Sequence, residues 1–220
     1  MSKRFRGWGP EALEFFERLE ADNTRTFWTD NRSTYQEAVR EPMDALSADV
    51  ADEFGELHTF RPHRDVRFSK DKTPYKTHIG AVTEGEGGEI YYVQLSATGI
   101  MAASGYHQMA RDQLARFREA VADDHSGPEL VERVAALKRS FEVGGEALKS
   151  APRGYPKDHP RIQYLRHKGL TLARSWPPAS WFSTARARTN IVNAWRAAAP
   201  VNGWLNEHVG PSTEPPPEGW

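Results

Sequence analysis

The chain has 220 residues, of which 38% are hydrophobic and 27% are charged, and its formal net charge is -1. This balance excludes a polycation that binds nucleic acid through its whole surface, so any basic site must be local. The absence of cysteine excludes disulfides, thiolate catalysis and zinc sites with cysteine ligands. No run of about 18 apolar residues occurs, so we expect no membrane-spanning helix and a cytoplasmic protein.

The first part of the chain has the periodicity of helices. Pro10 is typical of a helix start, and the apolar residues after it recur every three or four positions. A second apolar stripe covers Tyr35–Phe54 and contains Pro42, where we expect either a kink or a break between two helices. Gly55 is typical of a helix end.

The middle of the chain has the pattern of strands. The residues 57–68 are aromatic and β-like, although Pro62 favours an edge or a break. The alternation in "EIYYVQLSATGIMA" predicts a hairpin with its turn at Thr98-Gly99 and its return strand over Ile100–Ala103.

The last third of the chain returns to helices. Ser126 and Glu129 have the spacing of a capping box at the start of one of them. Asp158 is expected to cap a short helix that precedes the strand-like "LTLARSW". The final helix is expected to kink or break at Pro200.

Helices at both ends with strands between them predict an α+β fold. We expect a single domain over residues 1–210, in which an antiparallel sheet from the middle of the chain is flanked by N- and C-terminal helices. The residues 211–220 are rich in proline and polar groups, which predicts a flexible tail.

The common catalytic motifs are absent from the sequence. There is no phosphate-binding loop of the nucleotide hydrolases, no dinucleotide fingerprint, no serine nucleophile elbow and no HExxH zinc motif. The sequence therefore predicts no metal site, names no cofactor, and leaves open whether the protein is an enzyme.

Two segments concentrate basic residues and aromatic ones. Residues 61–78 carry six Lys and Arg against two acids, and residues 152–174 carry six against Asp158 alone. Proline stiffens both segments at Thr73-Pro74 and His159-Pro160, as a preorganised site requires. One interpretation is that both segments converge on a cationic pocket for an anion. The other is that they are solvated loops with structural ion pairs.

The pocket interpretation assigns candidate roles to residues of both segments. The candidate ligand-binding residues are Arg64, Arg67, Lys70, Lys72, Tyr75, Lys76, Tyr155, Arg161, Arg166 and Lys168. The candidate acid–base residues are Asp65, Asp71, Asp158 and His159, because a carboxylate beside cations stays ionised and a histidine titrates near neutrality.

Several stretches of the chain also resemble a known family. "FWTDNRSTY", "RDVRFSKDKTPYKTH", "YYVQLSATG" and "APRGYPKDHPRIQYLRHKGL" are together similar to a bacterial and fungal family of uncharacterised proteins, domain of unknown function 2461. The resemblance covers residues 11–209, and its most specific blocks are 67–77 and 154–160. It implies a shared fold and a common design for the two basic segments, but no reaction and no catalytic residues.

The sequence favours a protein that binds an anionic small molecule, either phosphorylated or nucleotide-like, with or without catalysis. The alternatives are a module that binds nucleic acid along an extended basic surface and a protein-interaction module whose basic segments are structural. The substrate and the oligomeric state stay open.

Overall fold

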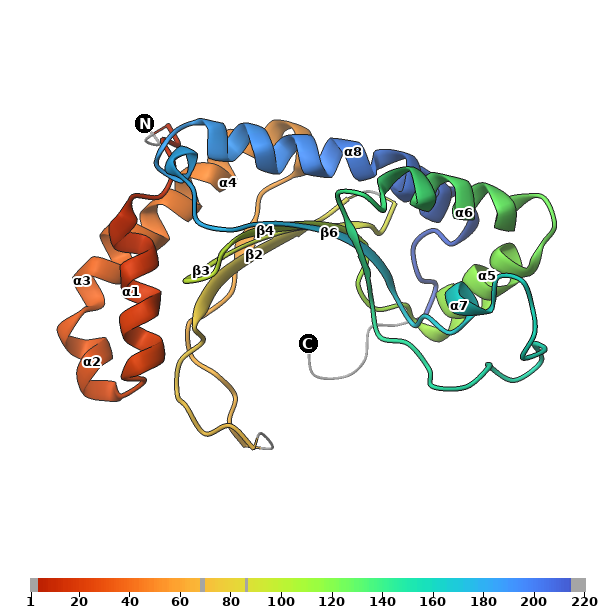
Figure 1. Cartoon of the computed structure of the whole chain (residues 1–220), viewed down its shortest axis with the longest axis horizontal. Helices are drawn as coiled ribbons and strands as arrows, with labels where there is room; N and C mark the ends of the chain where they lie inside the picture. The colour runs from red at the N-terminus through yellow and green to blue at the C-terminus, as the bar shows by residue number, and fades with distance from the viewer. Residues whose placement is uncertain (1–3, 68–69, 86, 215–220) are drawn as a thin grey trace. The chain divides into compact units, whose positions relative to one another are not determined.

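The computed structural model describes residues 4–67, 70–85 and 87–214 (Figure 1). The chain divides into two compact units. Unit 1 consists of Met1–Thr83, Tyr92–Ala102 and Ser175–Ala194, and unit 2 of Glu84–Tyr91, Ala103–Arg174 and Trp195–Trp220. Four strands and the last helix contribute residues to both units, and each unit is described by itself below. The single domain expected over residues 1–210 stays a prediction.

The strands form a six-stranded antiparallel sheet in the order β1-β2-β3-β4-β6-β5. Together with the helices at both ends of the chain, this sheet confirms the predicted α+β fold. The strands are β1 His58–Thr59, β2 His78–Glu84, β3 Ile90–Ser96, β4 Gly99–Tyr106, β5 Glu142–Gly144 and β6 Leu170–Trp176. The predicted hairpin is β3 and β4, and its return strand extends beyond Ala103 to Tyr106.

Unit 1 begins with the predicted helices. They are α1 Pro10–Ala21, α2 Arg25–Asp30, α3 Arg32–Thr34, a π-helical segment Tyr35–Arg40 and α4 Glu41–Phe54. Pro42 does not break this run. Because proline lacks the N–H that continues the ordinary ladder, the helix widens just before it, and the N–H of Glu41 bonds to the carbonyl of Gln36. Gly55 ends α4 with φ 84°, as predicted.

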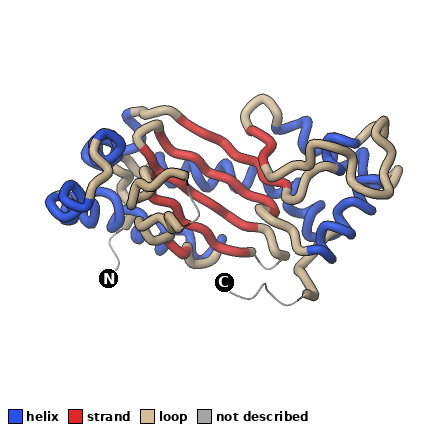
Figure 2. The backbone as a smooth tube through the Cα atoms, turned by 90° about the horizontal axis from the view of Figure 1, so that it is seen from below, coloured by secondary structure: helices blue, strands red, loops and turns tan. Residues whose placement is uncertain are grey.

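The core of unit 1 lies between these helices and the strands. Its fully buried side chains include Phe15, Phe16, Leu19, Met43, Leu46, Ile79, Val93 and Leu95. Helix α4 and the first half of α8 (Arg186–His208) cover one face of the strands, as Figures 1 and 2 show. No described helix crosses the other face of the unit 1 strands. This helix-free face carries the candidate site.

The segment 57–68 is less regular than its sequence predicts. Among the described residues, the strand here is limited to His58–Thr59, which pairs with β2; beyond it the Phe60 N–H donates to the carbonyl of Gly80, and a bridge joins His63 to Tyr75. Pro62 interrupts the strand pattern here because it lacks a ladder donor. The rest is a loop between β1 and β2, and Phe68 lies outside the described residues.

Unit 2 packs α5 Arg111–Ala122, α6 Ser126–Leu137 and α7 Ile162–Leu165 with the second half of α8. Trp204 is fully buried, and its Nε1 donates a hydrogen bond to the carbonyl of Ser126 over 2.9 Å. Helix α8 continues through Pro200, so of the two outcomes expected there the break does not occur, and the kink stays a prediction. None of the described helices is long and apolar enough to cross a membrane.

Two predicted helix caps in unit 2 are wrong. Ser126 is the first residue of α6, and its hydroxyl donates to the carbonyl of Ala120 over 2.7 Å, so it does not form a capping box. Asp158 does not cap α7, which begins after Arg161 without a side-chain cap. In both cases the residue spacing fits a cap, but the helix begins elsewhere.

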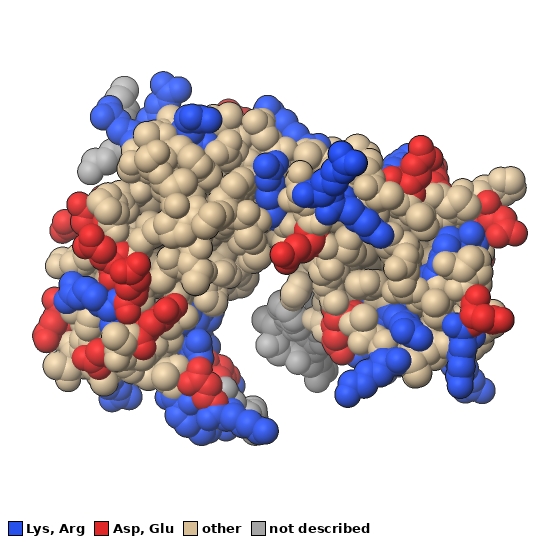
Figure 3. Space-filling model, viewed as in Figure 1, with Lys and Arg blue, Asp and Glu red and all other residues tan. Residues whose placement is uncertain are grey.

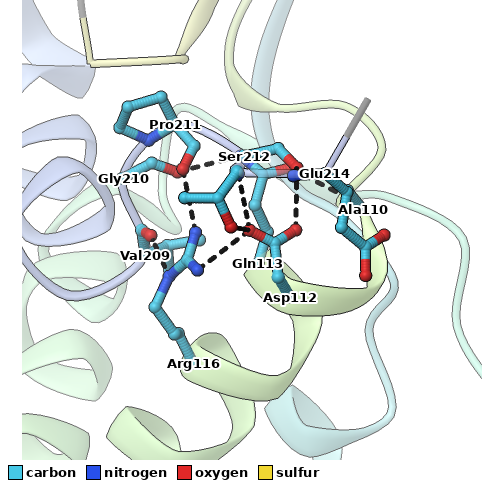
Figure 4. A network of polar contacts seen from close by, with 10 residues as sticks. Ala110, Asp112, Gln113, Arg116, Val209, Gly210, Pro211, Ser212 and Glu214 are labelled. Carbon is cyan, nitrogen blue, oxygen red and sulfur yellow. Dashed lines mark hydrogen bonds and ion pairs between the residues drawn. The ribbon is translucent and has the colours of Figure 1, made fainter. Parts of the chain in front are cut away.

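The C-terminal segment of unit 2 lies against α5 (Figure 4). The Asp112 carboxylate accepts hydrogen bonds from the N–H of Thr213 and the hydroxyl of Ser212, both over 2.8 Å. Arg116 donates to the carbonyls of Val209 and Pro211. The hydrogen bonds that Asp112 itself accepts, first the one from the Thr213 N–H, hold the pKa of its carboxyl group well below the usual range. Residues 211–214 of the predicted tail are therefore bound, and 215–220 lie outside the described residues.

Candidate functional site

The two basic segments belong to different units, so each has its own surroundings. Residues 61–78 lie in unit 1, mainly in the loop between β1 and β2, and residues 152–174 lie in unit 2. Figure 3 shows Lys and Arg side chains gathered with acidic ones at the tip of the β1–β2 loop. The expectation that both segments form one pocket stays a prediction.

Ion pairs within the β1–β2 loop use several of the candidate residues. Arg67 binds Asp65 with its Nη2 over 2.6 Å, and Arg64 binds Asp71. The Arg67 guanidinium lowers the pKa of Asp65 to about 2, and hydrogen bonds from Thr73 lower the pKa of Asp71. Both carboxylates are therefore ionised at neutral pH, which suits structural pairing better than proton donation.

Tyr75 is an anchor at the base of this loop. It is buried, and its ring stacks on Trp28 with centroids 4.3 Å apart and planes 9° apart. The Asn23 carboxamide bonds both backbone groups of Tyr75: its Nδ2 donates over 3.0 Å and its Oδ1 accepts over 3.1 Å. This pair of hydrogen bonds fixes the backbone next to Lys76. The ring of Tyr75 packs inward, so it supports the loop and does not offer a stacking surface.

Lys76 lies beside an exposed aromatic ring. Its Nζ is 5.2 Å from the centroid of Phe60, which is 39% exposed. The Phe60 ring lies 6.4 Å from Tyr92 of β3. Within the part of the chain that the structure describes, no ion pair joins Lys76 or Arg61 to a carboxylate. The positive charges of Lys76 and Arg61 are therefore not neutralised by a carboxylate in direct contact among the described residues.

The pKa values in this region report a positive potential. Burial, and then the charges of Arg61 and Arg64, lower the pKa of Lys76. Burial, and then the charges of Lys76 and Arg64, lower the pKa of His78. Like charges disfavour each other's protonated forms, so these groups lie within electrostatic reach of one another. We call Phe60, Arg61, Arg64, Lys76, His78 and Tyr92 the Lys76 cluster.

Tyr92 closes one side of the Lys76 cluster because β2 has a glycine opposite it. A Cβ atom at Gly80 would lie 2.5 Å from the Tyr92 hydroxyl, so only glycine leaves room for the ring across β2. The hydroxyl donates to Oε1 of Gln94 over 2.8 Å, and burial raises the pKa of Tyr92 to about 12. Tyr92 therefore acts as a neutral, positioned ring with its proton bound.

Four members of the Lys76 cluster were not among the candidates from the sequence: Phe60, Arg61, His78 and Tyr92. The alternation of β2 offered a signal, since His78 and Gly80 share a face of that strand. The remaining candidates of this segment lie outside the cluster. Lys72 is exposed and donates to the carbonyl of Val66 over 2.9 Å, and Lys70 is exposed.

Arg161 in the second segment is part of the framework of unit 2. It is 9% exposed, and its guanidinium donates to the carbonyls of Val121 and Ala122 over 2.6 and 2.7 Å. These carbonyls belong to the last turn of α5, which lacks intrahelical donors. A third bond joins Arg161 to Asp124 over 3.1 Å. These contacts support the structural interpretation of Arg161.

The other candidates of the second segment have separate partners. Lys168 binds Glu146 over 2.5 Å, and Nδ1 of His159 accepts the Arg161 N–H over 3.1 Å. Nε of Arg166 is buried without a hydrogen-bond partner among the described residues. Tyr155 is half-buried, and Asp158 is exposed. No described contact joins these side chains into one anion site.

The described residues contain no group of three or more His, Asp or Glu side chains placed to hold a metal ion.

The fold and the Lys76 cluster define an α+β protein with a local cationic and aromatic surface on a sheet. The chain matches the family model "conserved hypothetical protein (DUF2461)" over residues 11–204, and it belongs to this family, as its resemblance indicated. Neither a curated protein nor a solved structure matches the chain.

Proposed function

We propose that unit 1 binds a small phosphorylated molecule at the Lys76 cluster, on the helix-free face of β2 and β3. The observation that carries this proposal is the contact of Lys76, which has no carboxylate partner in the part of the chain that the structure describes, with the exposed ring of Phe60. A phosphate group supplies the negative charge that the cluster lacks, and the exposed ring offers an apolar surface to the rest of the ligand.

The cluster is built in a way that favours a bound anion over a solvated loop. Asn23 and Trp28 hold the backbone at Tyr75, so Lys76 projects from a fixed position. Preorganised cations bind an anion without the cost of ordering several long side chains. Partial burial lowers the local dielectric, which strengthens the attraction to phosphate.

Binding of inorganic phosphate and of adenosine monophosphate, measured by isothermal titration calorimetry, tests the proposal. We expect saturable binding of one ligand per chain, and Lys76→Met weakens it by roughly tenfold or more, the typical loss for one charge-assisted hydrogen bond. Lys72→Met is the matched control, because that lysine is exposed and bonds to a backbone carbonyl. It leaves the affinity unchanged.

Two outcomes contradict the proposal. One is that the wild-type protein binds neither ligand at millimolar concentration. The other is that Lys72→Met weakens binding as much as Lys76→Met does. Binding of a single-stranded oligonucleotide whose affinity falls with about the 0.7 power of salt per phosphate contact favours the nucleic-acid alternative instead. Catalytic roles for Asp65, Asp71, Asp158 and His159 stay predictions.

A further inference from the structure

The amine of Lys76 has different surroundings from that of Lys72 in the same loop. Lys72 is exposed and donates a hydrogen bond to the carbonyl of Val66 over 2.9 Å. Lys76 is half-buried, and its Nζ lies 5.2 Å from the centre of the exposed Phe60 ring. Within the described parts of the chain, this Nζ has neither a hydrogen bond nor an ion pair. The Lys76 amine is therefore open to a ligand and is not bonded to a neighbouring oxygen there.

The charges around this amine disfavour its ammonium form. The two carboxylates of the loop, Asp65 and Asp71, are paired with arginines, and neither is bonded to Lys76. Burial, and then the like charges of Arg61 and Arg64, lower the pKa of Lys76. A lysine beside an apolar surface and other cations has more of its neutral, nucleophilic form at neutral pH, and enzymes activate lysine nucleophiles in this way.

The backbone holds Lys76 at a defined place on the helix-free face. Asn23 bonds both backbone groups of the preceding residue, Tyr75, over 3.0 and 3.1 Å. The N–H of Lys76 itself donates to the carbonyl of Pro62 over 2.8 Å. Attack on a carbonyl carbon requires the two reacting atoms to meet in a narrow range of geometry, which a fixed backbone favours. The Phe60 ring beside the amine offers an apolar surface to the rest of the carbonyl compound.

We propose that Lys76 is a nucleophilic amine that forms an imine with a phosphorylated aldehyde. This inference rests on the proposed phosphate site and names the chemical class of its ligand. Arg61 has no ion pair with a carboxylate among the described residues, so its guanidinium is the counterion for the phosphate. The aldehyde carbon of the same molecule faces Nζ of Lys76. A phosphorylated aldehyde thus supplies an anion for the cations and an electrophile for the amine.

The covalent step balances without a further reactant. The Nζ lone pair forms a bond to the aldehyde carbon, and the π electrons of the carbonyl move to its oxygen, which takes up one proton that the nitrogen releases. The second nitrogen proton then passes to this hydroxyl group, which leaves as water, and a C=N double bond remains. When the imine takes up a proton from solvent it carries one positive charge, as the ammonium did. The phosphate therefore keeps a cation at this position.

Borohydride trapping with pyridoxal 5′-phosphate tests the proposal. This probe combines an aldehyde, a phosphate and an aromatic ring, and borohydride reduces its imine to a stable secondary amine that peptide mass spectrometry locates. With less than one probe per chain at neutral pH, we expect Lys76 to carry about tenfold more label than Lys72, because a bound phosphate brings the aldehyde to the amine. Lys72 is the control within the same molecule, since it is exposed and lies in the same loop.

Two further comparisons separate the nucleophile from the phosphate site. We expect saturating inorganic phosphate to suppress the labelling of Lys76, and pyridoxal, which lacks the phosphate, to label it about tenfold less. Equal labelling of Lys72 and Lys76 by pyridoxal 5′-phosphate overturns the nucleophile, and calorimetric binding of phosphate in the same protein then leaves the phosphate site standing. Selective labelling of Lys76 by both aldehydes alike, without competition by phosphate, overturns the phosphorylated class of ligand together with the phosphate site.

Discussion

The two basic segments contain the same number of Lys and Arg residues, but the structure uses them differently. In 152–174, Arg161 binds the end of α5, Lys168 binds Glu146, and Arg174 lies 6.0 Å over the ring of Phe141. In 61–78, the charged residues at the loop tip pair with one another, while Lys76 and Arg61 have no ion pair with a carboxylate among the described residues. The number of charges in a segment therefore says little about a site. What matters is which acceptors the fold places around each charge.

Replacement of Arg161 tests whether the basic residues of 152–174 support the fold. It has the largest expected effect on the free energy of unfolding. Arg161→Met lowers the free energy of unfolding by about 2–4 kcal/mol, because two α5 carbonyls lose their donors in a buried place. Urea denaturation measures the change. Arg153→Met removes an exposed charge from the same segment and shifts the free energy by less than about 0.5 kcal/mol.

Gly127 gives an independent control of the same contact. A Cβ atom there would lie 2.3 Å from the carbonyl oxygen of Val121 and 2.5 Å from Nε of Arg161, so Gly127→Ala disturbs both partners of this hydrogen bond without removing either. We expect a loss of stability in the same direction as for Arg161→Met. If Arg161→Met unfolds at the urea concentration of the wild type, Arg161 is available for a ligand and the contrast between the segments disappears.

The charge repulsion within the Lys76 cluster gives the next prediction, of intermediate size. Lys76→Met raises the pKa of His78 toward its ordinary value, since Lys76 is one of the charges that lower it. Saturating phosphate does the same in the wild type, because an anion favours protonated His78. The pH titration of the His78 ring protons by NMR measures both shifts. A pKa that does not respond to either change means that the cluster has no shared potential.

The same lowered pKa sets the sign of a stability effect. Folded His78 takes up its proton at a lower pH than the unfolded chain does, so the unfolded state binds more protons in the interval between the two pKa values. The contribution of His78 is complete above a pH of about 6.5, the ordinary histidine pKa, and is lost as the pH falls toward the folded pKa. The urea midpoint of unfolding, measured at several pH values across that interval, reports this contribution. We expect it to be absent in His78→Asn.

Most of the architecture could be predicted from the sequence, because apolar periodicity reports it directly. The stripe from Tyr35 to Phe54 and the alternation around Tyr91 led to the correct elements and fold class. The errors arose where a local pattern has two solutions. At Pro42 and Pro200 the sequence allowed a kink or a break. The helical run continues through both prolines without a break, and just before Pro42 its turn is widened.

The candidate site could be located only in part. The sequence pointed to Lys76 and Arg64, but it ranked Arg67 and Lys72 equally with them. Whether an arginine binds a neighbouring aspartate, a helix end or a ligand depends on contacts between residues distant in the chain, such as Arg161 with Val121. Phe60 and Tyr92 join the cluster through strand pairing and the open space at Gly80, which no local motif encodes.

Arg67→Ala provides the smallest expected effect and separates the loop tip from the Lys76 cluster. The Arg67 side chain is 77% exposed, and exposed ion pairs contribute little to stability. We expect no measurable change in the urea midpoint or in phosphate affinity. The pKa of Asp65 alone changes, rising from about 2 toward its ordinary value once the guanidinium is gone, as NMR titration of its carboxyl carbon would show. A clear loss of phosphate affinity in Arg67→Ala would instead place the anion at the tip of the loop, and Lys76 would then be a neighbour of the site and not its centre.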